Sequence, residues 1–179
     1  MAGTRYVRHS LAETIVGRRH DSLRGVFSSE MSVEIPRSGT RGSKMPRAAI
    51  AVMGLIPGLY RLLGGRAMGP TLILTTIGAK TGRKRDAQLT AFPEGDGWLV
   101  VASKGGDATH PAWFVNMARH PDQVWVQAGN RKVRVKPETL KGALRTTAWK
   151  RIVSEFANYG AYEQKTDREI PVIRLTPAM

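Results

Sequence analysis

Two glycine-containing loops carry the residues with the clearest chemical potential in this sequence. The first, residues 78–85, reads Gly-Ala-Lys-Thr-Gly-Arg-Lys-Arg and directly follows a β-rich run at 71–77. Its glycines let the backbone approach a ligand closely, while a threonine hydroxyl and basic side chains offer donors and positive charge. Such a loop either binds phosphate or forms a solvated basic hairpin. It is not a Walker A loop, because that motif needs glycine where Leu74 and Ala79 stand.

The second loop, residues 102–106 with the letters ASKGG, also ends a run typical of a buried strand. It comes shortly before Pro111, a residue suited to the first turn of a helix. The N-terminus of a helix attracts anions because its first N–H groups have no partners within the helix. If both loops lie at one rim of the fold, they can share one anion. Together they favour an acidic small-molecule ligand over a dispersed nucleic-acid surface.

Three aromatic residues are candidates for contact with a ligand. Tyr159 and Tyr162 follow a helical pattern and stand in a polar stretch, so we expect them to be exposed. They either pack locally or face a substrate. Trp113 stands in the first turn after the second loop, where its indole can pack on a ring, while the other tryptophans are expected in the core.

Composition removes several classes of chemistry. The chain has 179 residues and no cysteine, which excludes disulfides, thiolate catalysis and cysteine-ligated metals. Its four histidines have no metal-ligand spacing, so we expect no metal site. The net charge of +14 indicates an anionic partner. No nucleic-acid-binding motif appears and aromatics do not alternate with the basic runs, so we expect no nucleic acid.

The hydrophobic pattern predicts a small, mainly β domain of the α+β class. Tight turns separate most of its strands, which favours antiparallel pairing, and closure into a barrel would remove exposed sheet edges. We expect six strands with flanking helices. The expected elements are strands at 71–77, 86–92, 98–103, two within 123–136 and one at 171–175, with helices at 46–68, from Pro111 to about 120, and at 138–157.

The first part of the chain differs in composition from the rest. Residues 1–45 are rich in Arg, Ser and Gly, and we expect a basic, disordered N-terminal extension before a domain at 46–179. Met31 or Met45 is an alternative start of translation. The longest uncharged stretch, from Ala48 to Tyr60, is shorter than the roughly 20 residues of a spanning helix. Residues 46–68 therefore form either a core helix or a basic amphipathic helix at a membrane surface or over an active site.

Three motifs in the chain resemble those of a known family. TTIGAKTGRKR, ASKGGDATHPAWFVNMARHP and YGAYEQKTDREIP occur in this order between about residues 62 and 171. In type and mutual spacing they resemble the deazaflavin-dependent nitroreductase family. The resemblance implies a split β-barrel and coenzyme F420, a deazaflavin with a phosphate and an oligoglutamate tail. It also implies an oxidoreductase that transfers a hydride from the reduced deazaflavin to an electrophilic small molecule such as a quinone or a nitroaromatic compound.

The resemblance also assigns roles to single residues and a place in the cell. It implies a cytoplasmic enzyme, with peripheral contact to the inner face of the cell membrane through 46–68. An FMN-binding split-barrel oxidoreductase and a non-enzymatic nucleic-acid-binding module are the alternatives. The residues implied are Gly78, Lys80, Thr81, Gly82 and Arg85 for the phosphate and tail, Ser103, Lys104 and Gly105 for the second anion loop, Pro111, Trp113 and Asn116 beside the deazaflavin, and Tyr159 and Tyr162 as catalytic residues at the substrate.

Overall fold

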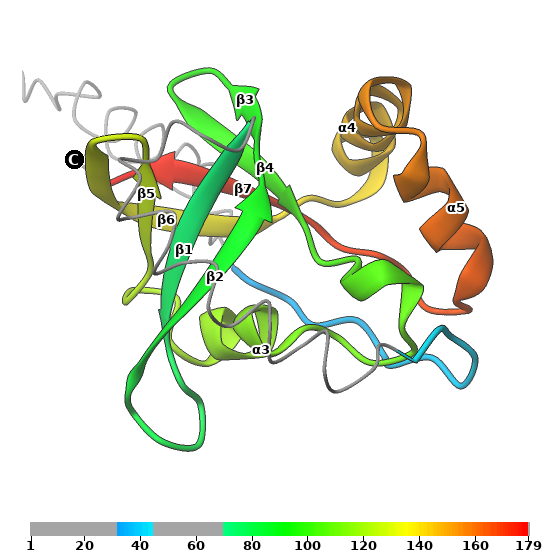
Figure 1. Ribbon diagram of the computed structural model, residues 1–179, viewed down its shortest axis with the longest axis horizontal. Helices are drawn as coiled ribbons and strands as arrows, with labels where there is room; N and C mark the ends of the chain where they lie inside the picture. Colours follow the sequence, from blue (N-terminus) through cyan, green and yellow to red (C-terminus); the bar gives the residue numbers. More distant parts are fainter. Residues whose placement is uncertain (1–31, 45–69, 179) are drawn as a thin grey trace, which may run out of the picture. The chain divides into compact units, whose positions relative to one another are not determined.

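The computed structural model describes residues 32–44 and 70–178 of the chain, shown in colour in Figure 1. Antiparallel strands and three α-helices build this part of the molecule. The strands are β1 (Thr71–Ile77), β2 (Lys84–Thr90), β3 (Phe92–Glu94), β4 (Gly97–Val101), β5 (Trp125–Ala128), β6 (Arg131–Thr139) and β7 (Val172–Pro177). The helices are α3 (Ala112–Arg119), α4 (Gly142–Glu155) and α5 (Asn158–Lys165), with a 3-10 turn, η1, at Lys104–Gly106.

The described strands form one sheet in the order β2-β1-β5-β6-β7-β4-β3, and each pairing between neighbours is antiparallel. The sheet curls so that β2 comes into contact with β4 (Figure 1). The predicted antiparallel, mainly β fold is confirmed. The sheet has seven strands where we expected six, because the run at 86–92 changes partner at Ala91. Residues up to Thr90 pair with β1, and residues from Phe92 pair with β4.

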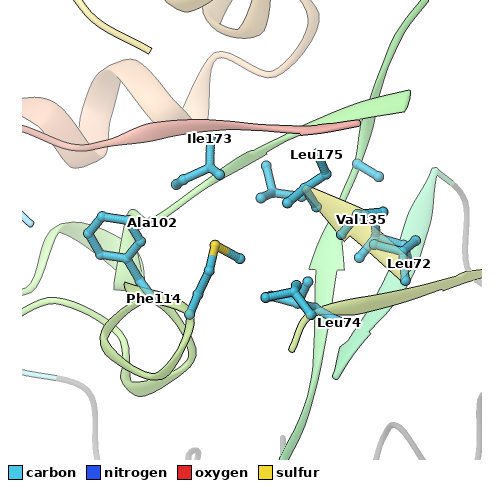
Figure 2. Packing of buried hydrophobic residues seen from close by; sticks show 12 residues of the cluster. Leu72, Leu74, Ala102, Phe114, Val135, Ile173 and Leu175 are labelled. Atoms are coloured by element: carbon cyan, nitrogen blue, oxygen red, sulfur yellow. The ribbon is translucent and has the colours of Figure 1, made fainter. Parts of the chain in front are cut away.

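The core inside the curl follows from the period of two along each strand. Leu72 and Leu74 of β1 face the same side as Ile173 and Leu175 of β7, and all four are fully buried (Figure 2). Helix α3 closes this core with Phe114 and Met117, which are three residues apart and therefore share one helix face. That packing leaves the neighbouring positions Trp113 and Asn116 on another face of α3.

A second apolar cluster lies between the sheet and helices α4 and α5. Leu99 of β4 and Val172 of β7 contribute to it, together with Trp149 and Ile152 of α4. Helix α4 begins at Gly142 rather than 138, because β6 continues to Thr139 in its pairing with β7. Helix α5 was not expected from the sequence, where Asn158 and Gly160 indicated a helix end. Its apolar contacts in this cluster stabilise a helix that its own sequence hardly favours.

Residues 32–44 lie along the domain and are joined to it by backbone hydrogen bonds. The N–H of Gly39 donates to the carbonyl of Ala108 at 2.8 Å, and the N–H of Ser43 donates to the carbonyl of Gly106 at 2.9 Å. These contacts reach across more than sixty positions of sequence, since each joins two segments far apart in the chain. Polar backbone groups thus hold much of the segment, and Val33 packs against the apolar core.

Asp167 provides a further anchor for the same segment. Its carboxylate accepts hydrogen bonds from the N–H and hydroxyl groups of Thr40 and from the N–H of Arg41, at 2.6–3.1 Å. The hydroxyl of Thr40 and these backbone donors lower the pKa of Asp167 from 3.8 to about 2. Residues 32–44 therefore pack on the domain, and the domain boundary expected at residue 45 stays a prediction. Backbone contacts of this kind produce no hydrophobic periodicity that a sequence pattern can reveal.

The remaining predictions for the N-terminal part fall outside the described residues. These include the disordered extension as far as residue 31 and the amphipathic helix at 46–68 with its membrane contact. Among the helices that the structure does describe, none has the length and apolar character needed to cross a bilayer.

Candidate active site

A groove of about 540 Å³ lies between the turn that joins β1 to β2 and the outer face of α3. The turn supplies its polar end, and the helix supplies much of its apolar wall. The lining residues are Gly78, Ala79, Lys80, Thr81, Arg85, Asp86 and Ala87 from the hairpin, and Ala112, Trp113, Val115 and Asn116 from α3. The structure therefore brings together Gly78, Lys80, Thr81, Arg85, Trp113 and Asn116 of the residues that the sequence predicted for cofactor binding.

The first loop is a tight turn whose hydrogen bonds explain its glycines. The N–H of Gly78 donates to the carbonyl of Arg83 at 2.8 Å, and the carbonyl of Gly78 accepts from Thr81 and Gly82. A Cβ on Gly78 would lie 2.7 Å from the hydroxyl oxygen of Thr81, which is too close. Gly82 has a φ of +63°, a conformation that glycine adopts at little cost. Gly82 thus shapes the loop without lining the groove.

The groove combines positive charge with an indole surface. Lys80 and Arg85 are exposed on the loop, and within the described residues neither forms an ion pair. Asp86 also lines the groove and accepts a hydrogen bond of 2.6 Å from the hydroxyl of Thr75. Trp113 also lines the groove. It is half-buried, and its ring meets the buried ring of Phe114 edge-on at 5.9 Å. An anionic ligand that carries a flat ring matches this combination.

Asn116 connects the two walls of the groove. Its Oδ1 accepts a hydrogen bond of 2.9 Å from the N–H of Ala79, and its Nδ2 donates to the hydroxyl of Thr76 at 3.4 Å. The sequence placed Asn116 beside a ligand ring, but nothing in the sequence indicated this bridge. The bridge joins residues 37 and 40 positions apart, so local patterns do not show it.

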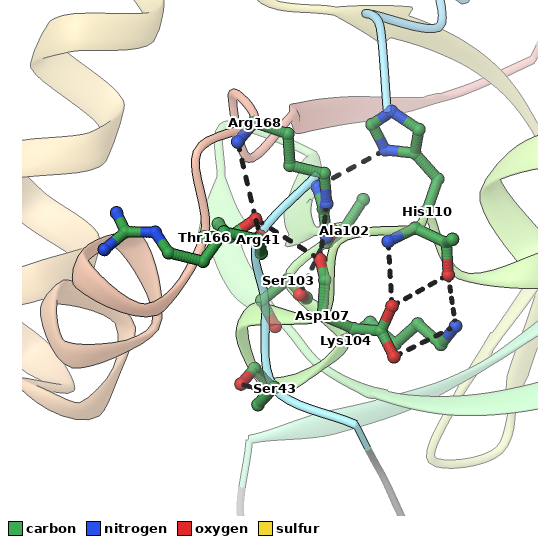
Figure 3. Close-up of polar contacts among 11 residues, drawn as sticks. Arg41, Ser43, Ala102, Ser103, Lys104, Asp107, His110, Thr166 and Arg168 are labelled. Carbon is green, nitrogen blue, oxygen red and sulfur yellow. Dashed lines mark hydrogen bonds and ion pairs between the residues drawn. The ribbon is translucent and has the colours of Figure 1, made fainter. Parts of the chain in front are cut away.

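The second loop is closed around a buried arginine (Figure 3). Arg168 is only 5% exposed and donates to the carbonyls of Ala102, Ser103 and Asp107 at 2.8–3.0 Å. Burial lowers the pKa of Arg168. Sequence reasoning missed this residue, because a single arginine in a polar stretch looks like a surface residue.

His110 links Arg168 to the segment 32–44. Its Nδ1 lies 3.3 Å from Nη1 of Arg168 and its Nε2 lies 2.8 Å from the carbonyl oxygen of Pro36 (Figure 3). Since a guanidinium only donates and a carbonyl only accepts, the ring is neutral with its proton on Nε2. Burial lowers the pKa of His110, and the charge of Arg168 adds to this effect against the hydrogen bond to Pro36. His110 therefore has a structural role here, not that of a metal ligand.

Lys104 of the second loop is engaged by its own neighbours. Its Nζ lies 2.6 Å from the hydroxyl of Thr109 and 3.4 Å from a carboxylate oxygen of Asp107. Its backbone φ of +48° is unusual for a residue other than glycine. Ser103, Lys104, Gly105 and Pro111 do not line the groove, so the described residues do not join the two loops in one cavity. Their contact with a cofactor stays a prediction.

The expectation that Tyr159 is exposed is wrong. Its side chain is 8% exposed and packs edge-on against Phe92 and Trp149, at ring distances of 5.9 and 6.5 Å. Burial raises the pKa of Tyr159. Tyr162 is half-buried, and its hydroxyl accepts a hydrogen bond of 3.2 Å from Nδ2 of Asn158. Neither tyrosine lines the groove, and their role at a substrate stays a prediction.

Comparison with known proteins decides the family. The family model for the F420H(2)-dependent quinone reductases matches residues 59–177. The chain belongs to this family. Among curated F420H(2)-dependent quinone reductases, Rv1261c of Mycobacterium tuberculosis is 35% identical over an alignment of 136 residues. The match covers 71% of this chain and 91% of that protein. The groove lies within the matched region, since its lining runs from Gly78 to Asn116.

Solved structures of similar sequence share the fold of this quinone reductase family member. An F420-H2 dependent reductase, FDR-A, is 39% identical and has a TM-score of 0.55, with 60% of this chain and 94% of that chain covered. A chain described as a domain-swapped dimer is 34% identical with a TM-score of 0.57, and the match covers 68% of this chain and 96% of that chain. The predicted family, its split-barrel-like fold and the deazaflavin cofactor that names the family are thereby confirmed.

Proposed function

We propose that this chain reduces quinone-like acceptors with a hydride from reduced coenzyme F420, and that the groove between the first loop and α3 holds this cofactor. One observation carries the assignment of the groove. Exposed cations and an indole line one cavity, within the region that matches the quinone reductase family. An anionic group and a planar ring are the two parts of a deazaflavin cofactor that such a lining can bind.

The residues present fit the cofactor at its anionic part. Lys80 and Arg85 offer charge-assisted hydrogen bonds to a phosphate, and the hydroxyl of Thr81 offers one more donor. Within the described residues the N–H of Lys80 meets no acceptor, so it too is available to an anion. Several donors around one oxyanion give both affinity and orientation.

The apolar part of the groove fits a ring. Trp113 and Val115 stand on α3, and Ala87 stands opposite on β2. Trp113 rests against the buried Phe114, which holds the indole in place. A rigid wall orients a ring at little entropic cost, because few side-chain rotations are lost on binding.

When bound, the reduced deazaflavin supplies the hydride, and the chain supplies binding, orientation and electrostatics. Lys80 and Arg85 neutralise the anionic part, and Trp113 positions the ring. Reduction of a quinone to a hydroquinone takes one proton in addition to the hydride. We propose water as the source of this proton rather than Tyr159, because Tyr159 does not line the groove and burial raises its pKa.

A binding comparison followed by an activity assay tests this function. Oxidised F420 and FMN are each titrated against the purified full chain, with binding followed by fluorescence. We expect F420 to bind much more tightly than FMN, and the loaded protein to reduce a soluble quinone when supplied with F420H2. Equal affinity for both flavins would favour the FMN-binding alternative, and no binding of either would refute the assignment of the groove.

We also propose that the catalytic domain includes residues 32–44 as well as the curled sheet and its helices. The hydrogen bonds that Gly39 and Ser43 donate, and those that the carboxylate of Asp167 accepts, support this extent. A chain that begins at residue 32 should therefore bind F420 as tightly as the full chain. A chain that begins at residue 45 should unfold at a lower temperature than the one that begins at 32.

A further inference from the structure

Asn116 is the only described side chain of α3 for which a hydrogen bond to the first loop is seen. The distance from its Oδ1 to the backbone nitrogen of Ala79 is 2.9 Å. A backbone N–H only donates, so the amide of Asn116 must turn its oxygen toward the loop. Its Nδ2 then faces the hydroxyl of the buried Thr76, 3.4 Å away. Both ends of the side chain are thereby fixed.

This contact holds two walls of the groove together. The first loop forms one wall and α3 forms the other, as their proximity in Figure 1 shows. The loop's own hydrogen bonds join Gly78, Thr81, Gly82 and Arg83 to one another. They define its turn but do not tie it to the helix. Asn116 supplies that tie, and α3 is itself anchored in the core by Phe114 and Met117.

We propose that Asn116 is a positioning residue for the anion-binding loop, which deepens and rests on the function proposed above. By holding the N–H of Ala79, it orients the following peptide and so directs the donors of Lys80 and Thr81 toward the anionic group. Its effect on the cofactor is exerted through the loop. This differs from a direct contact with the ring, which the position of Asn116 in the groove would otherwise suggest.

Amide hydrogen exchange tests the tie in the protein without any ligand. In Asn116→Ala the exchange of the Ala79 amide should become faster, because its acceptor is removed. In Asn116→Asp it should stay slow, because a carboxylate oxygen accepts the same hydrogen bond. Unchanged exchange in Asn116→Ala, or equally fast exchange in both variants, would overturn the proposal. Gln123→Ala, which removes an exposed amide just beyond α3, is the matched control.

A pair of ligands separates positioning of the loop from contact with the ring. The probes are oxidised F420 and the same deazaflavin riboside without its phosphate and tail. Loss of one neutral hydrogen bond should weaken the binding of F420 to Asn116→Ala about three- to tenfold. Binding of the phosphate-free riboside should remain as in the wild type. An equal loss for both ligands would mean that Asn116 contacts the ring, and no loss for F420 would mean that the tie does not matter.

The two ligands also keep this inference separate from the proposed function. If the wild-type chain binds neither F420 nor the riboside, the proposed function fails while the exchange measurement still judges the tie to Ala79. If the wild type binds F420 and Asn116→Ala binds it equally well, the function stands and the inference fails. Asn116→Asp should retain the loop geometry and bind F420 less tightly than the wild type, because its negative charge lies beside Lys80 and Arg85.

Discussion

The two basic glycine loops look alike in the sequence and differ in their contacts in the structure. Residues 78–85 leave Lys80 and Arg85 exposed at the groove, without ion pairs to the described residues. In the second loop Lys104 is paired with Asp107, and carbonyls of the loop accept hydrogen bonds from the buried Arg168. Two loops with glycine and positive charge after a strand therefore differ in how far other parts of the chain already occupy their donors and acceptors.

The difference has a physical origin in what each loop contacts. The first loop projects as a hairpin turn and meets the rest of the domain at Asn116. The second loop lies between Arg168, the segment 32–44 and helix α5, and a Cβ on Gly106 would lie 2.7 Å from the carbonyl oxygen of Tyr162. The first loop thus remains accessible to a ligand, while the second is packed against other parts of the domain.

Removal of the buried guanidinium tests the second loop and should have the largest effect on stability. In Arg168→Met, the carbonyls of Ala102, Ser103 and Asp107 lose the hydrogen bond from the guanidinium, although Ser103 still accepts from the N–H of Gly106 and Asp107 from the hydroxyl of Thr166. A hydrogen bond from a charged group contributes about 1.5–3 kcal/mol, so we expect a loss of about 3 kcal/mol of unfolding free energy. Urea unfolding measures it. Stability equal to that of the wild type would show that the second loop does not depend on Arg168.

Removal of the exposed cations of the first loop should weaken ligand binding and leave stability unchanged. Lys80→Ala and Arg85→Ala should each weaken F420 binding about tenfold, since charge-assisted hydrogen bonds are lost. The loss should shrink at high salt, because exposed charges are screened. Unfolding by urea should be unchanged in both variants. Fluorescence titration at two salt concentrations provides the measurement, and wild-type affinity in both would identify the first loop as a solvated hairpin.

Tyr159→Phe tests whether the buried tyrosine stabilises the fold or takes part in the reaction. The side chain of Tyr159 is buried, and this burial raises the pKa of its hydroxyl. Removal of this hydroxyl should lower the unfolding free energy by about 1 kcal/mol and leave kcat for a soluble quinone within about twofold. A fall in kcat of about 100-fold or more would instead support its predicted role as a proton donor.

Acidification should release the segment that covers the second loop before it affects the first. The pKa of Asp167 is about 2 in the folded protein and 3.8 without its hydrogen-bond partners. Its contribution to stability is therefore complete above pH 3.8. This contribution decreases below pH 3.8 and is lost as the pH falls through about 2, because over this range the unfolded state binds more protons than the folded state. Amide exchange at Thr40 and Arg41 should accelerate over this range. In Asp167→Asn the exchange of these amides should vary little with pH beyond the intrinsic rate.

Much of the fold was predictable because its signals are local. The β-rich run at 71–77 and the turn at 94–97 predicted antiparallel strands, and both features are present. The boundaries differ where a strand changes partner, as at Ala91, or where pairing extends it, as at Thr139. Such changes depend on which strand lies alongside, and that information is not contained in a window of neighbouring residues.

The sequence by itself determined the class of fold, the family through three ordered motifs, and the loop that lines the groove. Only the tertiary structure decided that Tyr159 is buried, that residues 32–44 pack on the domain, and that Arg168 closes the second loop. The reason is the range of the interactions. Periodicity and glycine turns act over a few residues, whereas Thr166 and Arg41, which share a hydrogen bond, are 125 positions apart. Long-range polar contacts determine which of two similar loops remains open to a ligand.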